Sequence, residues 1–89
     1  MIRQEVVICN TLGLHARAAA RFVQEASRFK SRIRIAQGGR TADGKSILGL
    51  LALVAAHGTR LTISADGTDQ QEALRALVDL VQNRFGEER

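Results

Sequence analysis

The chain has 89 residues and a net charge of +4, and 45% of its residues are hydrophobic. This length and composition predict one folded domain over residues 1–89, with an aliphatic core because Trp and Tyr are absent. A single cysteine, Cys9, excludes an internal disulfide, so we expect a cytoplasmic protein. The longest apolar run, Ile47–Ala56, is far shorter than the ~18 residues that cross a bilayer, and membrane insertion is not expected.

The first part of the chain predicts a strand and then a helix. Alternation over Glu5–Cys9 places Val6 and Ile8 on one face, which is typical of a strand that is wet on the other face. The helix is expected to begin near Ala16. Its inward positions recur at helical spacing and are Ala19, Val23 and Ala26, with Phe22 and Phe29 alongside.

The middle of the chain predicts a hairpin and a second helix. Two strands, Arg32–Gln37 and Arg40–Asp43, are joined by a tight turn at residues 38–39, both glycine. The second helix is expected to follow Ser46, a good N-cap residue, and to stop at Gly58. His57 would then lie in the last turn of that helix, where we assign it no function.

A last strand, Arg60–Ala65, and a last helix complete the order β-α-β-β-α-β-α. This helix is expected to start at Thr68 or Asp69, where Thr68 and Gln71 resemble a capping box, and to end at Gly86. Strands with one apolar face belong to an antiparallel sheet that is covered on that face. The expected class is therefore α+β, an antiparallel sheet with helices on one side.

Residues 39–46, GRTADGKS, fit the phosphate-loop pattern G-x-x-x-x-G-K-[ST], so a small nucleotide-binding protein is an alternative hypothesis. Such a protein needs several parallel strands with long crossovers, for which this chain has little room. The strands predicted here are antiparallel. We therefore interpret the match as a coincidence, with Gly39 in the hairpin turn, Lys45 beside the second helix and Ser46 as its cap.

The segment NTLGLHARAAARF, residues 10–22, carries the candidate chemistry. His15 stands where a helix normally begins with Ser, Thr, Asp or Asn, so the N–H groups of Ala16 and Arg17 are expected to lack a side-chain acceptor. Open donors, the helix dipole and an arginine form an anion site, where a largely exposed histidine could hold a phosphoryl group. From spacing alone, the simpler interpretation of a surface histidine at a poorly capped helix end is favoured.

Charge and exposed apolar residues predict a docking surface for an acidic partner. Arg17, Arg21, Gln24 and Arg28 form one polar stripe on the first helix, although such a stripe is also typical of a solvated face. Leu48 and its neighbours cannot all face inward on a short helix, so some are expected to be exposed. Nucleic acid is not an expected partner, because the few aromatic rings are assigned to the core and leave no stacking platform.

The segments GLHARAA, FKS, DGKSILGLLAL and FGE, in this order, resemble the HPr family, the histidine-containing phosphocarrier proteins of the bacterial phosphotransferase system. The resemblance covers essentially the whole chain and implies an open-faced β-sandwich, with four antiparallel strands and three helices on one face. It implies that His15 takes a phosphoryl group on Nδ1 from enzyme I and passes it to IIA proteins. It also implies that Arg17 stabilises the phosphate and that HPr kinase/phosphorylase modifies Ser46 in some bacteria.

The resemblance further implies a carrier without catalytic activity of its own, and we expect a monomer with no cofactor or metal. Its docking residues for enzyme I, the IIA proteins and the kinase would be Arg21, Gln24, Ile47, Leu48 and Leu51. Ala18 stands where the family usually has proline, which should leave the first helical turn slightly less preorganised. The nitrogen-branch paralogue, NPr, shares the histidine motif and is the alternative, but Ser46 within GKSILGL favours the sugar branch.

Overall fold

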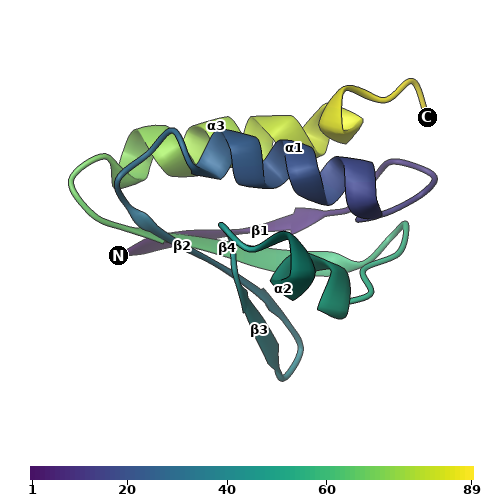
Figure 1. The fold of residues 1–89 in the computed structure, drawn as a ribbon, viewed down its shortest axis with the longest axis horizontal. Helices are drawn as coiled ribbons and strands as arrows, with labels where there is room; N and C mark the ends of the chain where they lie inside the picture. The colour runs from purple at the N-terminus through teal and green to yellow at the C-terminus, as the bar shows by residue number, and fades with distance from the viewer.

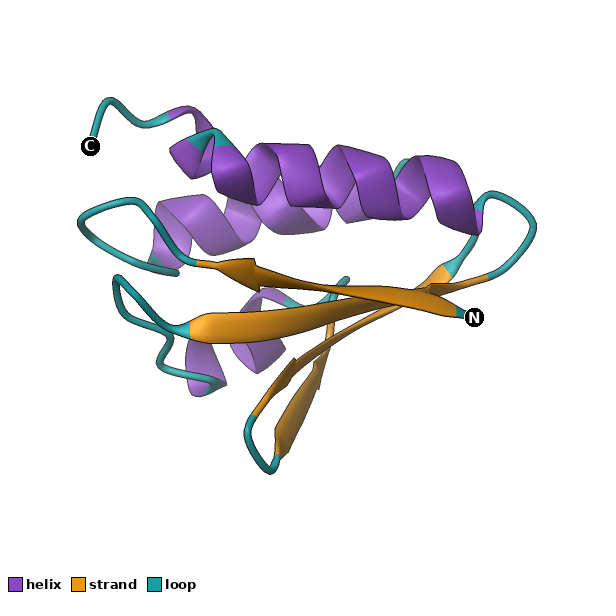
Figure 2. Ribbon diagram, turned by 180° about the vertical axis from the view of Figure 1, so that it is seen from behind, coloured by secondary structure: helices purple, strands orange, loops and turns teal.

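The computed structural model describes residues 1–89, which form a four-stranded sheet and three α-helices (Figure 1). The elements in chain order are β1 (Ile2–Val7), α1 (Ala16–Ala26), β2 (Arg32–Gln37), β3 (Arg40–Asp43), α2 (Ile47–Ala52), β4 (Arg60–Asp66), α3 (Gln70–Gln82) and a 3-10 turn, η1 (Arg84–Gly86). The strand order is β1-β4-β2-β3, and every neighbouring pair is antiparallel. Helices α1 and α3 lie side by side over one face of the sheet (Figures 1 and 2), and α2 packs against α1 and β3. The expected α+β open-faced sandwich is confirmed.

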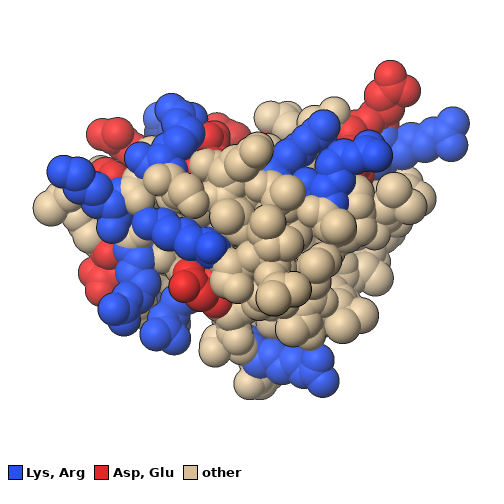
Figure 3. All heavy atoms as spheres, viewed as in Figure 1, with Lys and Arg blue, Asp and Glu red and all other residues tan.

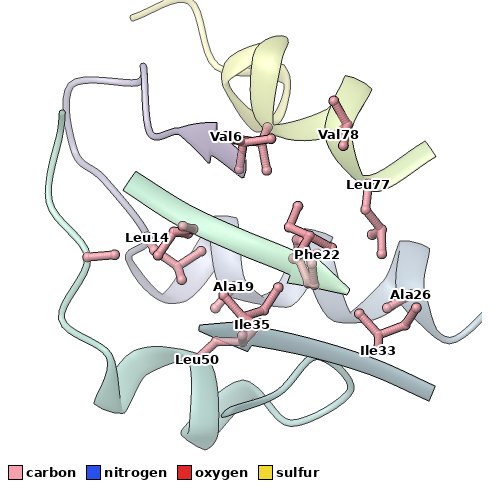
Figure 4. Close-up of a cluster of buried hydrophobic side chains, with 14 of the residues drawn as sticks. Val6, Leu14, Ala19, Phe22, Ala26, Ile33, Ile35, Leu50, Leu77 and Val78 are labelled. Atoms are coloured by element: carbon pink, nitrogen blue, oxygen red, sulfur yellow. The ribbon is translucent and has the colours of Figure 1, made fainter. Parts of the chain in front are cut away.

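The core fills the space between the sheet and the helices (Figure 4). Strand β2 shows why these residues form a half-covered sheet: Ile33 and Ile35 are buried, whereas Arg32 and Arg34 point to solvent. The helices cover the apolar face with side chains that include Ala19, Phe22, Ala26, Leu50, Leu77 and Val78. Each large aliphatic or aromatic side chain buried in this way contributes about 1.5–3 kcal/mol to folding.

The residues of the phosphate-loop pattern form a hairpin and a strand. Gly39 lies in the turn between β2 and β3, and Arg40–Asp43 form β3, which pairs antiparallel with β2. Ser46 caps α2, because its Oγ accepts a hydrogen bond from the N–H of Gly49 at 3.0 Å. A strand therefore occupies the place where a phosphate loop would wrap its backbone around an anion, and the nucleotide-binding hypothesis is not supported by the fold.

The first strand begins and ends earlier than expected. It runs over Ile2–Val7, where each residue has a partner in β4, and the predicted segment Glu5–Cys9 was placed too late. Ile8 leaves the regular ladder and instead exchanges hydrogen bonds with the loop before β4, donating to Thr59 O and accepting from Gly58 N–H. Ile8 is nevertheless fully buried, as its position in the pattern predicted.

The second helix is shorter than expected and does not reach Gly58. It ends at Ala52, because Val54 adopts a left-handed backbone conformation with φ of 52° and Ala55 O accepts the N–H of Leu14 at 2.8 Å. The prediction that His57 lies in the last turn of this helix is therefore wrong. None of the helices combines the length and the apolar character that a membrane span requires.

The third helix begins at Gln70, and the predicted capping box between Thr68 and Gln71 is absent. The carboxylate of Asp69, at the N-cap, accepts hydrogen bonds from the N–H groups of Lys30 and Ser31 and from Ser31 Oγ. These hydrogen bonds, the one from the Ser31 hydroxyl above all, hold the pKa of Asp69 below its ordinary value. The residue at the N-cap is Asp69 and not Thr68, and its side chain does not cap α3 but ties the helix to the loop before β2.

The close approach at Gly13 generates a prediction about stability. A Cβ there would lie 2.6 Å from Ala55 O, and the backbone has φ of 71°. We expect Gly13→Ala to lower the free energy of unfolding by about 1–3 kcal/mol, through the clash and the strained φ. Gly39→Ala is the control, since nothing lies within 4 Å of its Cβ position, and it should change stability by less than about 0.5 kcal/mol. Urea unfolding measures both, and equal stabilities would contradict the role of this contact.

Candidate functional site

His15 immediately precedes α1 and caps it with its own ring. Its backbone is extended, with φ of −82° and ψ of −178°, and its Nδ1 accepts a hydrogen bond from the N–H of Arg17 at 3.3 Å. The expectation that the Arg17 N–H lacks a side-chain acceptor is therefore wrong. The N–H of Ala16, the first of the helix, has no acceptor within the chain. His15, the candidate reactive residue, therefore lies at the positive end of the α1 dipole.

The second ring nitrogen of His15 contacts a carboxylate near the end of the chain. Nε2 lies 2.5 Å from Oε2 of Glu87, and the His15 side chain is 27% exposed, less than the sequence suggested. The other oxygen of Glu87 accepts from Asn10 Nδ2 at 2.9 Å, and the same Nδ2 donates to Gly13 O at 2.8 Å. Sequence reasoning missed both Asn10 and Glu87, because the three residues meet only in the folded chain.

The C-terminal tail, residues 84–89, reaches His15 because the chain turns sharply after α3. The helix ends at Gln82, earlier than the expected end at Gly86, and Arg84 and Phe85 take left-handed φ values of 58° and 54°. The Phe85 side chain is buried in the core, and its carbonyl accepts a hydrogen bond from the Arg21 guanidinium. Figure 1 shows the tail at the same end of the molecule as the loop between β1 and α1.

Hydrogen bonds indicate which atoms of His15 and Glu87 carry protons. Partial burial opposes ionisation of Glu87, but hydrogen bonds from His15 and Asn10, together with the positive charges of His15 when it is protonated and of Arg17, hold its pKa below the ordinary value. An ionised carboxylate only accepts hydrogen bonds, so His15 Nε2 carries the proton in this contact. Nδ1, which accepts the Arg17 N–H, then holds the lone pair of the neutral ring. This tautomer leaves Nδ1 as the nucleophilic atom.

The predicted basic stripe on α1 is not one free surface. Arg21 donates to a carbonyl of the C-terminal tail, and Arg28 pairs with Glu25 at 2.6 Å. Arg17 and Gln24 are exposed. Only part of the stripe is therefore free to meet a partner, and Arg17 is its member beside His15.

Two hollows flank His15. One, of about 520 Å³, lies between the loop after β1, the arginines of α1 and the C-terminal tail, and Arg17, Arg21 and Glu87 are among its lining residues. The other, of about 250 Å³, is a shallow apolar depression beside the ring, lined by Leu12, Leu14, His15, Leu51, Val54, Ala55 and Ala56. The structure therefore brings Leu51 close to His15, as the docking hypothesis requires.

Helix α2 presents apolar side chains around Ser46. Leu48 is 80% exposed and Ile47 is 41% exposed, which confirms that this helix cannot bury all of its apolar residues. Figure 3 shows a broad area of this face without charged side chains, with Lys and Arg at its edges. Ser46 lies at the start of α2, and Leu51 lies near its other end, toward His15.

The structure contains no group of three or more His, Cys, Asp or Glu side chains placed to bind a metal ion.

Comparison with known proteins identifies the family. The family model PTS-HPr, described as the PTS HPr component phosphorylation site, matches residues 2–83. The chain belongs to the HPr family. Phosphocarrier protein HPr of Neisseria meningitidis is 48% identical over 87 residues, covering 98% of each chain. The HPr-like protein Crh of Bacillus subtilis is 45% identical over 82 residues, covering 92% of this chain and 96% of Crh. The crystal structure of HPr from Thermoanaerobacter tengcongensis superposes on this HPr-family fold with a TM-score of 0.96, at 44% identity and 100% coverage of both chains.

The lowered pKa of Glu87 predicts how its contribution to stability depends on pH. A carboxyl whose folded pKa lies below its ordinary value of 4.5 stabilises the fold above that pH and loses its effect as the pH falls through the folded value. We therefore expect Glu87→Gln to be less stable than the parent above pH 4.5, and the difference to shrink in stronger acid.

Urea unfolding across this range measures the difference. Glu88→Gln is the control, because the Glu88 side chain makes no hydrogen bond or ion pair in the structure. A constant difference between the parent and Glu87→Gln at all pH values would contradict the prediction.

Proposed function

We propose that this chain carries phosphoryl groups in a bacterial phosphotransferase system, accepting them on His15 Nδ1 from enzyme I and passing them to IIA proteins. The observation that carries the proposal is the placement of Nδ1. Its lone pair lies at the N-terminus of α1, while Glu87 accepts the proton on the opposite ring nitrogen. Family membership supports the carrier role, since the relatives with the HPr name are phosphocarrier proteins.

The N-terminus of α1 suits the incoming phosphoryl dianion. When Nδ1 bonds to phosphorus, it no longer accepts the Arg17 N–H, and that N–H can donate to a phosphoryl oxygen together with the free N–H of Ala16. The helix dipole favours negative charge at this place. The exposed Arg17 guanidinium adds planar donors that match phosphate oxygens. We propose that Arg17 stabilises the phosphoryl group and that Ala16 and Arg17 bind it through the backbone.

The proposed docking surface consists of Arg21, Gln24, Ile47, Leu48 and Leu51, in which Gln24 and the exposed apolar side chains of α2 are free and Arg21 also bonds to the Phe85 carbonyl. The exposed apolar side chains of α2 and the apolar depression beside His15 support this assignment, as they lie next to the atom that must reach a partner's active site. A docking surface made of a few side chains suits a transient complex, and a relay protein must release each partner after transfer. The protein would act as a cytoplasmic monomer, with Ser46 as a regulatory target where HPr kinase/phosphorylase is present.

The function is tested by incubation with enzyme I and phosphoenolpyruvate, followed by intact mass measurement. We expect the parent to gain one phosphoryl group and His15→Ala to gain none, because the substitution removes the nucleophile. Loss of the ring as an N-cap should cost about 0.5–1 kcal/mol of stability, so the variant stays folded. His57→Ala, which changes an exposed loop histidine, should behave like the parent. Phosphate on His57, or uptake by His15→Ala, would overturn the assignment.

The proposed docking surface predicts the effect of charge at Ser46. Ser46→Asp retains a good N-cap for α2 but adds negative charge beside Ile47 and Leu48, where an acidic partner is expected. We expect uptake of phosphate from enzyme I to slow by at least about ten-fold, since like charges across an interface disfavour docking. Ser46→Asn is the matched control, because asparagine caps equally well and is neutral. Equal initial rates for the two variants would remove this corner from the docking surface.

A further inference from the structure

Glu87 joins two hydrogen-bond donors beside the reactive ring. Its Oε1 accepts from Asn10 Nδ2 at 2.9 Å, and its Oε2 lies 2.5 Å from His15 Nε2. Asn10 presents an N–H to it, and because His15 Nδ1 accepts the Arg17 N–H, the ring proton lies on Nε2 and faces it as well. The group between the two neighbours must therefore accept twice and donate nothing. Among side chains, an ionised carboxylate meets this requirement. A glutamine has one acceptor oxygen, and its NH₂ would face one of the two donors.

Asn10 fixes the orientation of that carboxylate. The Asn10 side chain is fully buried, and its Nδ2 donates both to Glu87 and to Gly13 O at 2.8 Å. Its Oδ1 is buried without a hydrogen-bond partner. A flipped amide would place that oxygen against two acceptors, the Glu87 carboxylate and the Gly13 carbonyl. The unpaired oxygen is therefore consistent with an amide that uses both of its N–H bonds to hold the loop and Glu87.

We propose that Glu87 is a positioning residue for His15, held in turn by Asn10, and that it selects the Nε2–H tautomer and stabilises the positive ring formed on phosphoryl uptake. The inference rests on the proposed function and deepens it. A carboxylate behind a histidine ring plays the same part in hydrolases with a serine-histidine-aspartate triad, where it sets the tautomer and stabilises the imidazolium. Here the ring itself is the nucleophile.

The phosphoryl step shows where the charge arises. The Nδ1 lone pair forms a bond to phosphorus, while the donor's bond to phosphorus breaks and its electron pair stays on the donor. Nε2 keeps its proton, so the ring gains one positive charge and no proton has to leave. The Glu87 carboxylate already contacts that N–H, and its lowered pKa keeps it ionised at neutral pH. On transfer to the next acceptor, the N–P bond breaks, its electron pair returns to Nδ1 and the ring is neutral again.

Other charged groups surround the same place. Arg17 on α1 acts on Glu87 through its charge, and Arg21 lines the hollow beside it. From the tail itself, Glu88 and Arg89 line the same hollow. None of these charged side chains contacts the His15 ring by hydrogen bond or ion pair, whereas the Glu87 carboxylate does. The backbone N–H of Arg17 favours the same tautomer by donating to Nδ1, and Glu87 adds the acceptor for the proton on Nε2.

The test compares Glu87→Gln with Glu88→Gln, two variants that remove the same charge from adjacent residues. Nitrogen-15 NMR of the His15 ring reports which nitrogen carries the proton, with no partner protein needed. Stopped-flow transfer from phospho-enzyme I reports the uptake rate. We expect Glu87→Gln to lower the Nε2–H share and to slow uptake by about ten-fold or more, by analogy with the aspartate-to-asparagine change in a serine protease triad. Glu88→Gln should match the parent in both measurements.

The two readouts separate the possible failures. A parent protein that takes no phosphate overturns the proposed function, whereas the NMR measurement still decides whether Glu87 sets the tautomer. An unchanged tautomer in Glu87→Gln overturns the inference at any rate of uptake. A changed tautomer with parental uptake overturns the role of Glu87 in transfer. The amide spectrum of Glu87→Gln shows that the variant is folded, which is expected because the residue lies outside the core.

Discussion

The first turn of a helix has N–H groups without acceptors inside the helix, and at α1 the His15 ring satisfies one of them through Nδ1. This hydrogen bond fixes the ring and points its lone pair at the positive end of the helix dipole. It uses one ring nitrogen as an acceptor, so the other must carry the proton of the neutral ring and needs an acceptor of its own. The remainder of the site supplies that acceptor, since the tail after α3 places Glu87 against Nε2.

The sheet and its helices hold these groups at fixed positions. The loop between β1 and α1 is tied down by Leu14 N–H on Ala55 O and by the buried Asn10. The close approach at Gly13 leaves no room for a side chain. At the other end of the chain, Phe85 is buried in the core and orients the tail. The site is thus formed by loops, but each loop is anchored by a buried residue.

Much of the fold could be predicted from the sequence, because period-two alternation and paired glycines are local signals. The bounds of β2 and β3 follow from them, and Ser46 as a helix cap follows from the preference for serine at that position. The errors lie where a distant residue decides the local structure. Asp69 is the N-cap residue of α3, but its side chain accepts a hydrogen bond from Ser31 and does not cap the helix. The carbonyl of Ala55 accepts the N–H of Leu14, and α2 ends before it. For the candidate site, the GLHARAA motif identifies His15, whereas Glu87 becomes visible only when the tail is placed in space.

The return of the tail has a consequence for how the protein is made. His15 lies near the start of the chain, and Glu87 follows it by 72 positions. A ribosome therefore synthesises His15 well before Glu87, and the nascent chain lacks the Nε2 acceptor until residue 87 has emerged. By then every element from β1 to η1 has been synthesised. The orientation of the ring through Nε2 is thus a late event in the formation of the site, after the residues of the core are all available.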